Sequence, residues 1–304
     1  MTLTAESKAL LALSAKRNPT EMNQRPLSTI RAGLKMIPPS TTPIFHTADV
    51  TVSTGSVPVP VRIYRPSSAT DLPVAIYMHG GGFAIGSLGM VDDFCRHLAD
   101  IADLIVVSID YRLAPEHPYP AQIDDAVTVW DWMASAPPEL GETSGKMVSI
   151  GESAGGTVAL ALALKTRDQG TRRPDAVVSY YGTNELVLSN PELETPPMLS
   201  AADCEWFWNM YLPEGADRDS PYAVPGNAKS FEGIGPTLVI TPEYDPTRDS
   251  MELFVDRLAG DGVDATLHRF DGVMHGFMTM IDALPEATEA IRLTGDFIAK
   301  KLAG

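Results

Sequence analysis

The spacing of apolar and polar residues changes along the chain and predicts which segments form strands and which form helices. Residues 48–53 and 57–64 alternate between apolar and polar positions, which is typical of strands, and the turn-forming residues 54–56 between them predict a hairpin. After the hairpin, β-rich runs and runs with helical period take turns to the C-terminus. This order predicts a mostly parallel, three-layer α/β domain with an antiparallel start.

The predicted elements of this domain are short runs separated by turn residues. Strands are expected at residues 73–78, 104–111, 147–150, 175–181, 236–241 and 265–270. Helices are expected at residues 91–102, 123–133, 154–167, 248–259 and 285–301. Because residues 104–107 are apolar throughout, we expect helices to cover both faces of the sheet.

Two regions do not follow the alternation of strands and helices. The first 45 residues hold two amphipathic segments, 4–16 and 27–37, which predict short helices without a core of their own. Between residues 181 and 236 there is no strand pattern, but residues 201–211 predict a helix rich in aromatic side chains. We therefore expect a cap over a catalytic domain. The cap comprises residues 1–45 and 183–219, and the catalytic domain comprises residues 46–182 and 220–304.

Composition and charge exclude several classes of function. With 304 residues, 44% of them hydrophobic, the chain can bury a large core, so disorder is not expected. The formal net charge of −16 disfavours nucleic acid and anionic membrane surfaces as partners. No apolar run is long enough to span a membrane, and two cysteines, Cys95 and Cys204, are too few for a disulfide framework. A cytoplasmic location is the simplest expectation.

A candidate nucleophile lies between a predicted strand and a predicted helix. The residues Gly151-Glu152-Ser153-Ala154-Gly155 match G-x-S-x-G, the pattern of a serine on a sharp strand-to-helix turn. Small residues on both sides let the backbone pass closely, so that Ser153 Oγ projects above the sheet. The alternative is a glycine-rich turn in which the serine only caps the helix.

A serine nucleophile needs a general base, and candidates are limited by chain order. In sheets of this kind the order is serine, acid, histidine, and only His268 and His275 follow Ser153. His268 lies within a predicted strand. His275 lies in a glycine-containing loop just after that strand, so we predict that His275 is the base.

The acid that orients the base is expected at the end of the preceding strand. Asp245 follows the strand at 236–241 by a few residues, and we predict that it fills this role. Glu243 and Asp249 are neighbours that could substitute, although Asp249 is expected to cap or pair within the next helix. Asp271 is a further candidate, but it lies too close to His275 in sequence to reach Nδ1 easily.

Acyl transfer also needs hydrogen-bond donors for a negatively charged oxygen. The residues His79-Gly80-Gly81-Gly82-Phe83 follow a predicted strand, and glycines leave backbone N–H groups unobstructed. We predict Gly81, Gly82 and Ala154 as the donors, with His79 fixing the loop. A phosphate-binding loop is disfavoured because its G-K-[ST] and G-x-G-x-x-G patterns are missing here. No cluster with the tight spacing of metal ligands occurs, so no metal is expected.

Five motifs in one order resemble a known family. They are residues 79–83, 111–121 and 151–156, the pair Asp245-Pro246 and the run His275-Gly276-Phe277. Together they are similar to the bacterial hormone-sensitive-lipase-like esterases, family IV of the lipolytic enzymes, from about residue 50 onwards. The resemblance implies an α/β-hydrolase fold with an eight-stranded, mostly parallel sheet and a helical cap. It also implies a cofactor-free serine carboxylesterase that prefers short to medium acyl chains.

One residue departs from the family pattern. The family usually has aspartate before the serine, and this chain has Glu152. One methylene longer, Glu152 is expected to help position the histidine loop, with a shift in rate and pH optimum.

The substrate pocket and the partners follow from the same pattern. An apolar pocket is expected from aromatic residues of the cap together with residues near the serine. These candidates are Phe83, Glu152, Trp206, Phe207, Trp208 and Tyr211. The expected partner is a small-molecule ester, and a homodimer is plausible because the strand at 265–270 should be a sheet edge. An amidase or acyltransferase with the same three residues, or a ligand-binding homologue without catalysis, are the alternatives.

Overall fold

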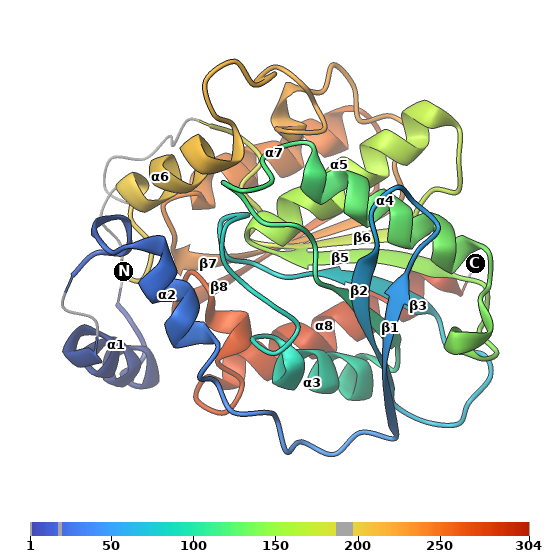
Figure 1. The fold of residues 1–304 in the computed structure, drawn as a ribbon, viewed down its shortest axis with the longest axis horizontal. Helices are drawn as coiled ribbons and strands as arrows, with labels where there is room; N and C mark the ends of the chain where they lie inside the picture. Colours follow the sequence, from blue (N-terminus) through green and yellow to red (C-terminus); the bar gives the residue numbers. More distant parts are fainter. Residues whose placement is uncertain (1, 18–19, 187–196, 304) are drawn as a thin grey trace.

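An eight-stranded sheet runs through the middle of the protein (Figure 1). The computed structural model describes residues 2–17, 20–186 and 197–303. The strand order is β1-β2-β4-β3-β5-β6-β7-β8, and the first two strands are antiparallel to their neighbours while the rest are parallel. The strands are β1 His46–Val52, β2 Val59–Arg65, β3 Val74–Met78, β4 Ile105–Ile109, β5 Met147–Glu152, β6 Ala176–Tyr180, β7 Thr237–Tyr244 and β8 Ala265–Met274. The predicted hairpin, the parallel sheet and the edge position of the last strand are therefore present.

Helices cover both faces of this sheet, as the apolar strands predict. The helices α3 Asp92–Ala102 and α8 Pro285–Leu302 lie on one face, and α4 Ala121–Ala134, α5 Ala154–Gln169 and α7 Arg248–Gly260 lie on the other (Figure 1). Every residue of the inner strands β3, β4, β5 and β6 is buried. Two apolar cores result, one on each face of the sheet, and they hold the carboxyl ends of the parallel strands in register.

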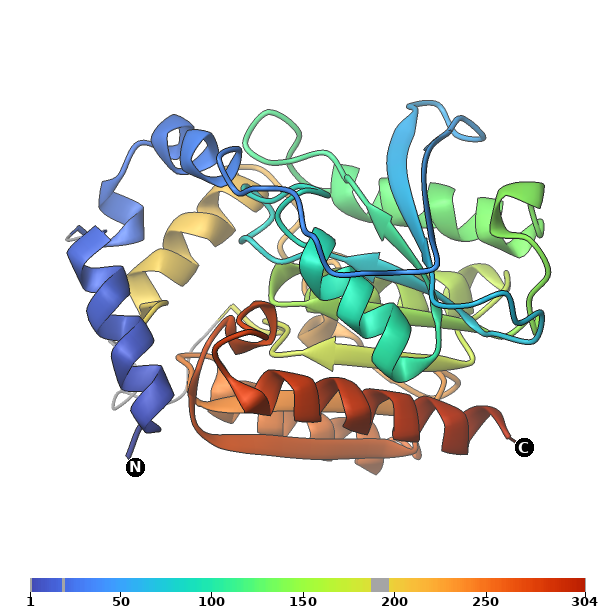
Figure 2. The same ribbon diagram turned by 90° about the horizontal axis from the view of Figure 1, so that it is seen from below.

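The remaining helices gather at one end of the sheet. These are α1 Ala5–Arg17, α2 Leu27–Leu34 and α6 Ala201–Tyr211, which lie together on the left of Figure 2. The Asn23 N–H donates to Asp203 Oδ1 at 2.8 Å, so the N-terminal segment and α6 are joined directly. Arg31 of α2 donates to Ala84 O at 2.9 Å and to Ala114 O at 2.7 Å. This guanidinium therefore ties α2 to the loop that follows β3 and to the loop that follows β4.

Short 3₁₀ turns complete the described elements. They are η1 Met22–Gln24, η2 Pro138–Leu140, η4 Pro225–Asn227 and η5 Phe277–Thr279. None of the helices among the described residues has the length and apolar character needed to cross a membrane.

Candidate active site

Ser153 occupies the sharp turn between β5 and α5. Its backbone has φ 50° and ψ −124°, a conformation that residues with a side chain rarely adopt. A Cβ atom at Gly155 would lie 2.0 Å from Met78 O, and one at Gly151 would lie 2.1 Å from Gly155 O. Glycine is therefore required on both sides of the serine for the chain to turn this closely, which is the geometry that the G-x-S-x-G pattern predicts.

Asp245 and His275 lie side by side because their strands end together. Tyr244, the last residue of β7, pairs with Met274, the last residue of β8, and the His275 N–H donates to Tyr244 O at 3.1 Å. Both strands extend beyond the predicted ends, because this pairing continues past an irregularity between Pro242 and Tyr244. The two side chains consequently leave adjacent strand ends in the same direction.

A chain of hydrogen bonds connects the three predicted residues. His275 Nε2 lies 2.9 Å from Ser153 Oγ, and His275 Nδ1 lies 2.6 Å from Asp245 Oδ2. Asp245 is fully buried and its Oδ1 accepts from the N–H and the hydroxyl of Thr247, at 2.8 and 2.6 Å. With an ionised Asp245, Nδ1 carries the ring hydrogen and Nε2 is left to accept from the serine.

The alternative acids and the second histidine lie elsewhere. Glu243 accepts from the Gly272 N–H at 2.8 Å, and Asp249 pairs with Arg248 at 2.7 Å. Asp271 is exposed and pairs with Arg269, and His268 is an exposed residue of β8. None of these side chains is brought to Ser153 by a contact among the described residues.

The loop after β3 lies next to the serine. We call residues 79–83 the oxyanion loop, because they include the predicted donors Gly81 and Gly82. Gly81 and Gly82 have φ values of 111° and 57°, and with Ala154 they line the same cavity as Ser153. Ala154 is the first residue of α5, so its N–H has no partner within the helix.

Two aromatic side chains support the oxyanion loop from beneath. His79 Nδ1 donates to Gly80 O at 2.7 Å, and the Tyr111 hydroxyl donates to His79 O at 2.7 Å. The two rings stack with centroids 4.2 Å apart. Burial lowers the pKa of His79 to about 4, so this imidazole is neutral near pH 7.

Glu152 is buried directly behind the serine. Its side chain accepts hydrogen bonds from the Gly80 N–H at 3.1 Å and from the Tyr181 hydroxyl at 2.7 Å. Burial raises the pKa of this carboxyl. The expected link to the histidine loop is indirect: the Tyr181 ring, whose hydroxyl is bound to Glu152, packs against the His275 ring with centroids 4.8 Å apart.

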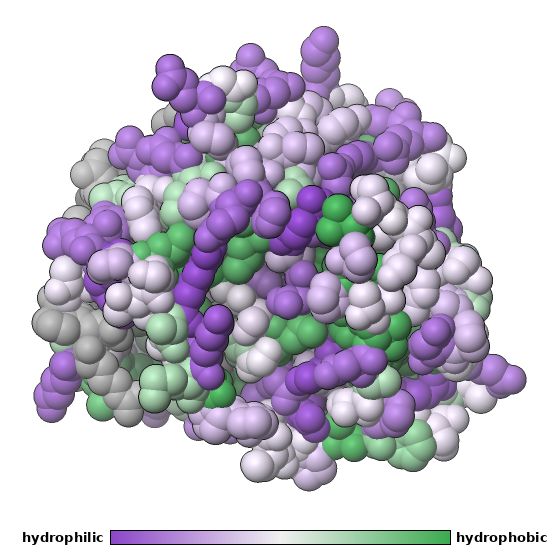
Figure 3. Space-filling view, in the orientation of Figure 1, coloured by the Kyte–Doolittle hydropathy of each residue, from purple (hydrophilic) through white to green (hydrophobic). Residues whose placement is uncertain are grey.

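A cavity of about 470 Å³ opens above Ser153 and His275. Its wall is largely apolar and includes four of the six predicted pocket residues, Phe83, Glu152, Phe207 and Trp208. Apolar residues are also visible in the hollow near the middle of the face shown in Figure 3. The volume is within the usual range for sites that bind small ligands.

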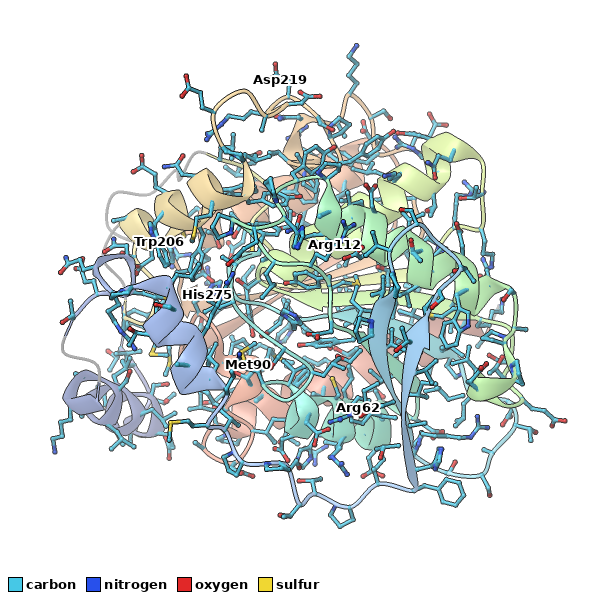
Figure 4. The ribbon with its side chains drawn as sticks, viewed as in Figure 1. Arg62, Met90, Arg112, Trp206, Asp219 and His275 are labelled. Carbon is cyan, nitrogen blue, oxygen red and sulfur yellow. The ribbon has the colours of Figure 1, made fainter. Side chains whose placement is uncertain are left out.

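The other two predicted pocket residues lie outside this wall. Tyr211 is buried and stacks on Phe83 with centroids 3.8 Å apart, so it supports the pocket from behind. Trp206 packs against Phe207 with centroids 4.9 Å apart (Figure 4 labels Trp206 on α6). Trp206, Phe207 and Trp208 are consecutive in α6, and successive residues of a helix point about 100° apart, so these three side chains cannot all face one cavity.

Several residues of the wall were not predicted from the sequence. They are Met22, Leu34, Ile37, Ile85, Met90, Met198, Leu199, Cys204, Met280 and further residues beside the serine and the histidine. Met22, Leu34 and Ile37 come from the N-terminal segment, and nothing in their local pattern separates a pocket residue from an ordinary packing residue. From the sequence, these wall residues could have been found only through the prediction that the N-terminal segment caps the catalytic domain.

One group of possible metal ligands comes together at the surface. Single ligand atoms of Asp93, His97 and Asp282 all lie within 4.8 Å of one another. Asp93 Oδ1 already accepts from the hydroxyls of Ser40 and Thr42, at 2.5 and 2.6 Å. The sequence spacing gave no sign of this group, because Asp282 approaches only through the fold. Its acidic side chains add negative charge near the cavity, which Asp93 also lines.

The fold and the sharp strand-to-helix turn at Ser153 define the class of protein, and comparison with known proteins agrees. Residues 75–279 match the profile of a family described as the α/β hydrolase fold, so the chain belongs to this family. The esterase LipI of Mycobacterium tuberculosis is 36% identical over 82% of this chain and 80% of its own length. The structure of a hyperthermophilic esterase from the archaeon Pyrobaculum calidifontis covers all of both chains, with 34% identity and a TM-score of 0.91. A gibberellin receptor of Arabidopsis thaliana is 32% identical over 68% of this chain and 61% of its own length.

These matches confirm the family resemblance that the five motifs indicate. They also confirm the predicted fold class and the predicted enzyme class, a carboxylic ester hydrolase.

Proposed function

We propose that the protein is a serine carboxylesterase in which Ser153, His275 and Asp245 form a catalytic triad. The observation that supports this most directly is the continuous hydrogen-bonded chain from Asp245 through His275 to Ser153 at the floor of an apolar cavity. Ser153 Oγ attacks the ester carbonyl while His275 Nε2 accepts its proton. Asp245 holds the ring and stabilises the imidazolium that forms.

The rest of the cycle uses the same groups. The N–H groups of Gly81, Gly82 and Ala154 stabilise the charged oxygen of the tetrahedral intermediate. His275 then returns the proton to the departing alcohol, which leaves an acyl-enzyme on Ser153. A water molecule, deprotonated by His275, attacks this ester and releases the carboxylic acid.

The cavity supports a substrate with a short to medium acyl chain. Its wall is apolar and its volume is about 470 Å³, which leaves room for a small ester rather than a long lipid. The described residues within 1–45 and 183–219 act as the cap, because Met22, Leu34 and Phe207 supply part of this wall; residues 1, 18–19 and 187–196 of the predicted cap lie outside the described residues. A series of p-nitrophenyl esters of increasing chain length measures the preference.

Ser153→Ala tests the function as a whole. Loss of ester hydrolysis by at least about 10³-fold is expected, since the nucleophile is removed while the cavity is kept. Hydrolysis at the original rate would exclude the proposed role of Ser153. Matched esters and amides then separate a carboxylesterase from an amidase, and alcohol added in competition with water detects acyl transfer.

The similarity to a gibberellin receptor raises a second candidate, a ligand-binding protein without turnover. The complete hydrogen-bonded chain at Ser153 supports the enzyme instead. Tight binding of a small apolar ligand with no hydrolysis of any activated ester would favour the receptor.

Assembly and location are part of the same proposal. We propose a homodimer formed through the exposed edge of β8, where Thr266 to Arg269 are exposed. The free, buried cysteines Cys95 and Cys204 fit a reducing compartment, which supports a cytoplasmic location.

A further inference from the structure

A buried carboxyl group lies behind the nucleophile and is not used in the reaction steps above. Glu152 is the last residue of β5 and only 4% exposed. Its partners among the described residues are two neutral donors, the Gly80 N–H and the Tyr181 hydroxyl. Among the described residues, the other ionisable side chain that favours the charged form of Glu152 is His275, and no lysine or arginine pairs with it. Burying a carboxyl group costs free energy, and the two hydrogen bonds to Glu152 offset part of that cost.

One oxygen of Glu152 holds the oxyanion loop. Gly80 begins the three glycines of that loop, and Glu152 Oε1 accepts its N–H at 3.1 Å. The backbone passes so close that a Cβ atom at Gly80 would lie 2.8 Å from Oε1 and 3.2 Å from Ser153 Cβ. Because Glu152 directly precedes Ser153, this hydrogen bond fixes the start of the oxyanion loop relative to the nucleophile.

The other oxygen reaches the segment that carries the base. We call residues 275–280 the histidine loop. Tyr181, whose hydroxyl donates to Glu152 Oε2, packs against the rings of His275 and Phe277 with centroids 4.8 and 5.7 Å apart. The Met278 backbone N–H interacts with the same hydroxyl. One tyrosine thus joins Glu152 to His275, Phe277 and Met278 of the histidine loop.

The backbone of Tyr181 is held in an unusual conformation for this purpose. Its φ is 41°, a left-handed value that costs about 1–3 kcal/mol for a residue with a side chain. The Tyr181 N–H donates to Ile240 O at 2.7 Å, which keeps the residue in place at the end of β6. In this conformation the phenol points back toward Glu152 and under the histidine ring.

We propose that Glu152 is a positioning residue that fixes the oxyanion loop through Gly80 and the histidine loop through Tyr181. The proposal rests on the proposed function, since it assigns both loops to the reaction. Glutamate, one C–C bond or about 1.5 Å longer than aspartate, reaches both donors from the end of β5. The structure therefore gives a reason for the residue that departs from the family pattern.

Tyr181→Phe tests the link to the histidine loop, and Tyr77→Phe is its matched control. Both hydroxyls are buried close to Glu152, but the Tyr77 hydroxyl has no hydrogen-bond partner among the described residues. Tyr181→Phe is expected to lower kcat for p-nitrophenyl butanoate about tenfold with KM changed less than about twofold. Tyr77→Phe is expected to leave both within about twofold. Equal kcat values in the two variants would overturn the proposal.

Glu152→Gln separates positioning from mere support of the fold. The amide keeps the shape and an acceptor for Gly80, but it cannot accept from Tyr181 as well without a mispaired donor. Its kcat should fall at least about tenfold while its melting temperature changes little, because removal of a buried acidic group offsets the cost of the mispaired donor. If the variants that lose most kcat are also those that lose most melting temperature, Glu152 has a structural role and the proposal is overturned.

The double variant Glu152→Gln/Tyr181→Phe completes the cycle. If Glu152 acts on the histidine loop through Tyr181, the kcat of the double variant should equal that of Glu152→Gln within about twofold, because Glu152→Gln has already broken this link. Multiplying losses would overturn the proposal. Ser153→Ala, assayed in parallel, separates the proposed triad from the proposed role of Glu152. Loss of activity in Ser153→Ala supports the triad whatever the Glu152 and Tyr181 variants do. Full activity in Ser153→Ala would exclude the triad.

Discussion

Gly82→Ala is expected to disable the oxyanion loop because its added methyl group would clash with the Phe207 ring of α6. A Cβ atom at Gly82 would lie 2.1 Å from Cγ and Cδ1 of Phe207, whereas ordinary contact begins at 3.4 Å. The loop or the ring must therefore move by about 1.3 Å, the difference between these distances. Displacement of about 1 Å at a reacting centre lowers turnover on the order of 10²-fold, and loss of one oxyanion donor costs about 10² to 10³-fold.

The assay is steady-state hydrolysis of p-nitrophenyl butanoate, with thermal unfolding measured on the same samples. Gly82→Ala should lower kcat by about 10² to 10³-fold. Gly82 also has a positive φ of 57°, so backbone strain needs its own control. Gly145→Ala supplies it, since Gly145 has a φ of 75° and open space around it. This control should lose about 1 kcal/mol of stability and keep its kcat.

Phe207→Ala in the Gly82→Ala background tests the steric cause. Removing the ring clears the space beside Gly82, so the double variant should regain at least about tenfold in kcat over Gly82→Ala. Unchanged turnover in Gly82→Ala would refute the assignment of Gly82 to the oxyanion loop. Failure of Phe207→Ala to restore any activity would refute the steric explanation.

Three further predictions concern stability, the cap and assembly. Burial lowers the pKa of His79 from 6.5 to about 4, so the unfolded chain binds a proton at a higher pH than the folded protein does. The free energy of unfolding should therefore fall by on the order of 3 kcal/mol as the pH drops from about 6.5 to 4. Denaturant unfolding of His79→Asn should show a shallower fall with pH, and equal falls in the two proteins would contradict the prediction. Arg31→Met releases α2 from two backbone carbonyls and should raise KM about three- to tenfold with kcat kept. Its control is Glu116→Gln, which only weakens the exposed ion pair with Arg31 and should keep KM within about twofold. Equal KM values in the two variants would contradict the role of Arg31 in holding α2. Leu267→Glu places a charge on the β8 edge and should convert a dimer to monomer in light scattering, whereas a monomeric parent protein would exclude this interface.

Local pattern and chain order were sufficient to predict most of the fold and to select the three residues that we propose as the triad. The alternation of strands and helices predicted every strand of the sheet, with errors confined to the ends. Ser153, Asp245 and His275 were found because each follows a strand, and the carboxyl ends of parallel strands meet at one edge. Only the pairing of Tyr244 with Met274 explains why the acid and the base are adjacent, and that pairing is a property of the sheet.

The walls of the cavity and the contacts of Glu152 lay beyond sequence reasoning. Met22 and Leu34 line the cavity because the N-terminal segment folds back over the sheet, and no spacing in the chain records that approach. Glu152 bonds to Gly80, 72 positions away, and to Tyr181, 29 positions away. Such long-range contacts depend on the order of β3, β5 and β6 in the sheet, which local periodicity does not specify.

The triad is tested most directly by covalent labelling with diethyl p-nitrophenyl phosphate, which transfers a diethylphosphoryl group to an activated serine and releases p-nitrophenol. We expect intact-mass analysis to show one added group per chain, peptide mapping to place it on Ser153, and Ser153→Ala to remain unlabelled. His275→Ala should react at least about 10³-fold more slowly, because Oγ then lacks its base. Labelling of Ser153→Ala at the original rate, or at another residue in the parent protein, would contradict the account.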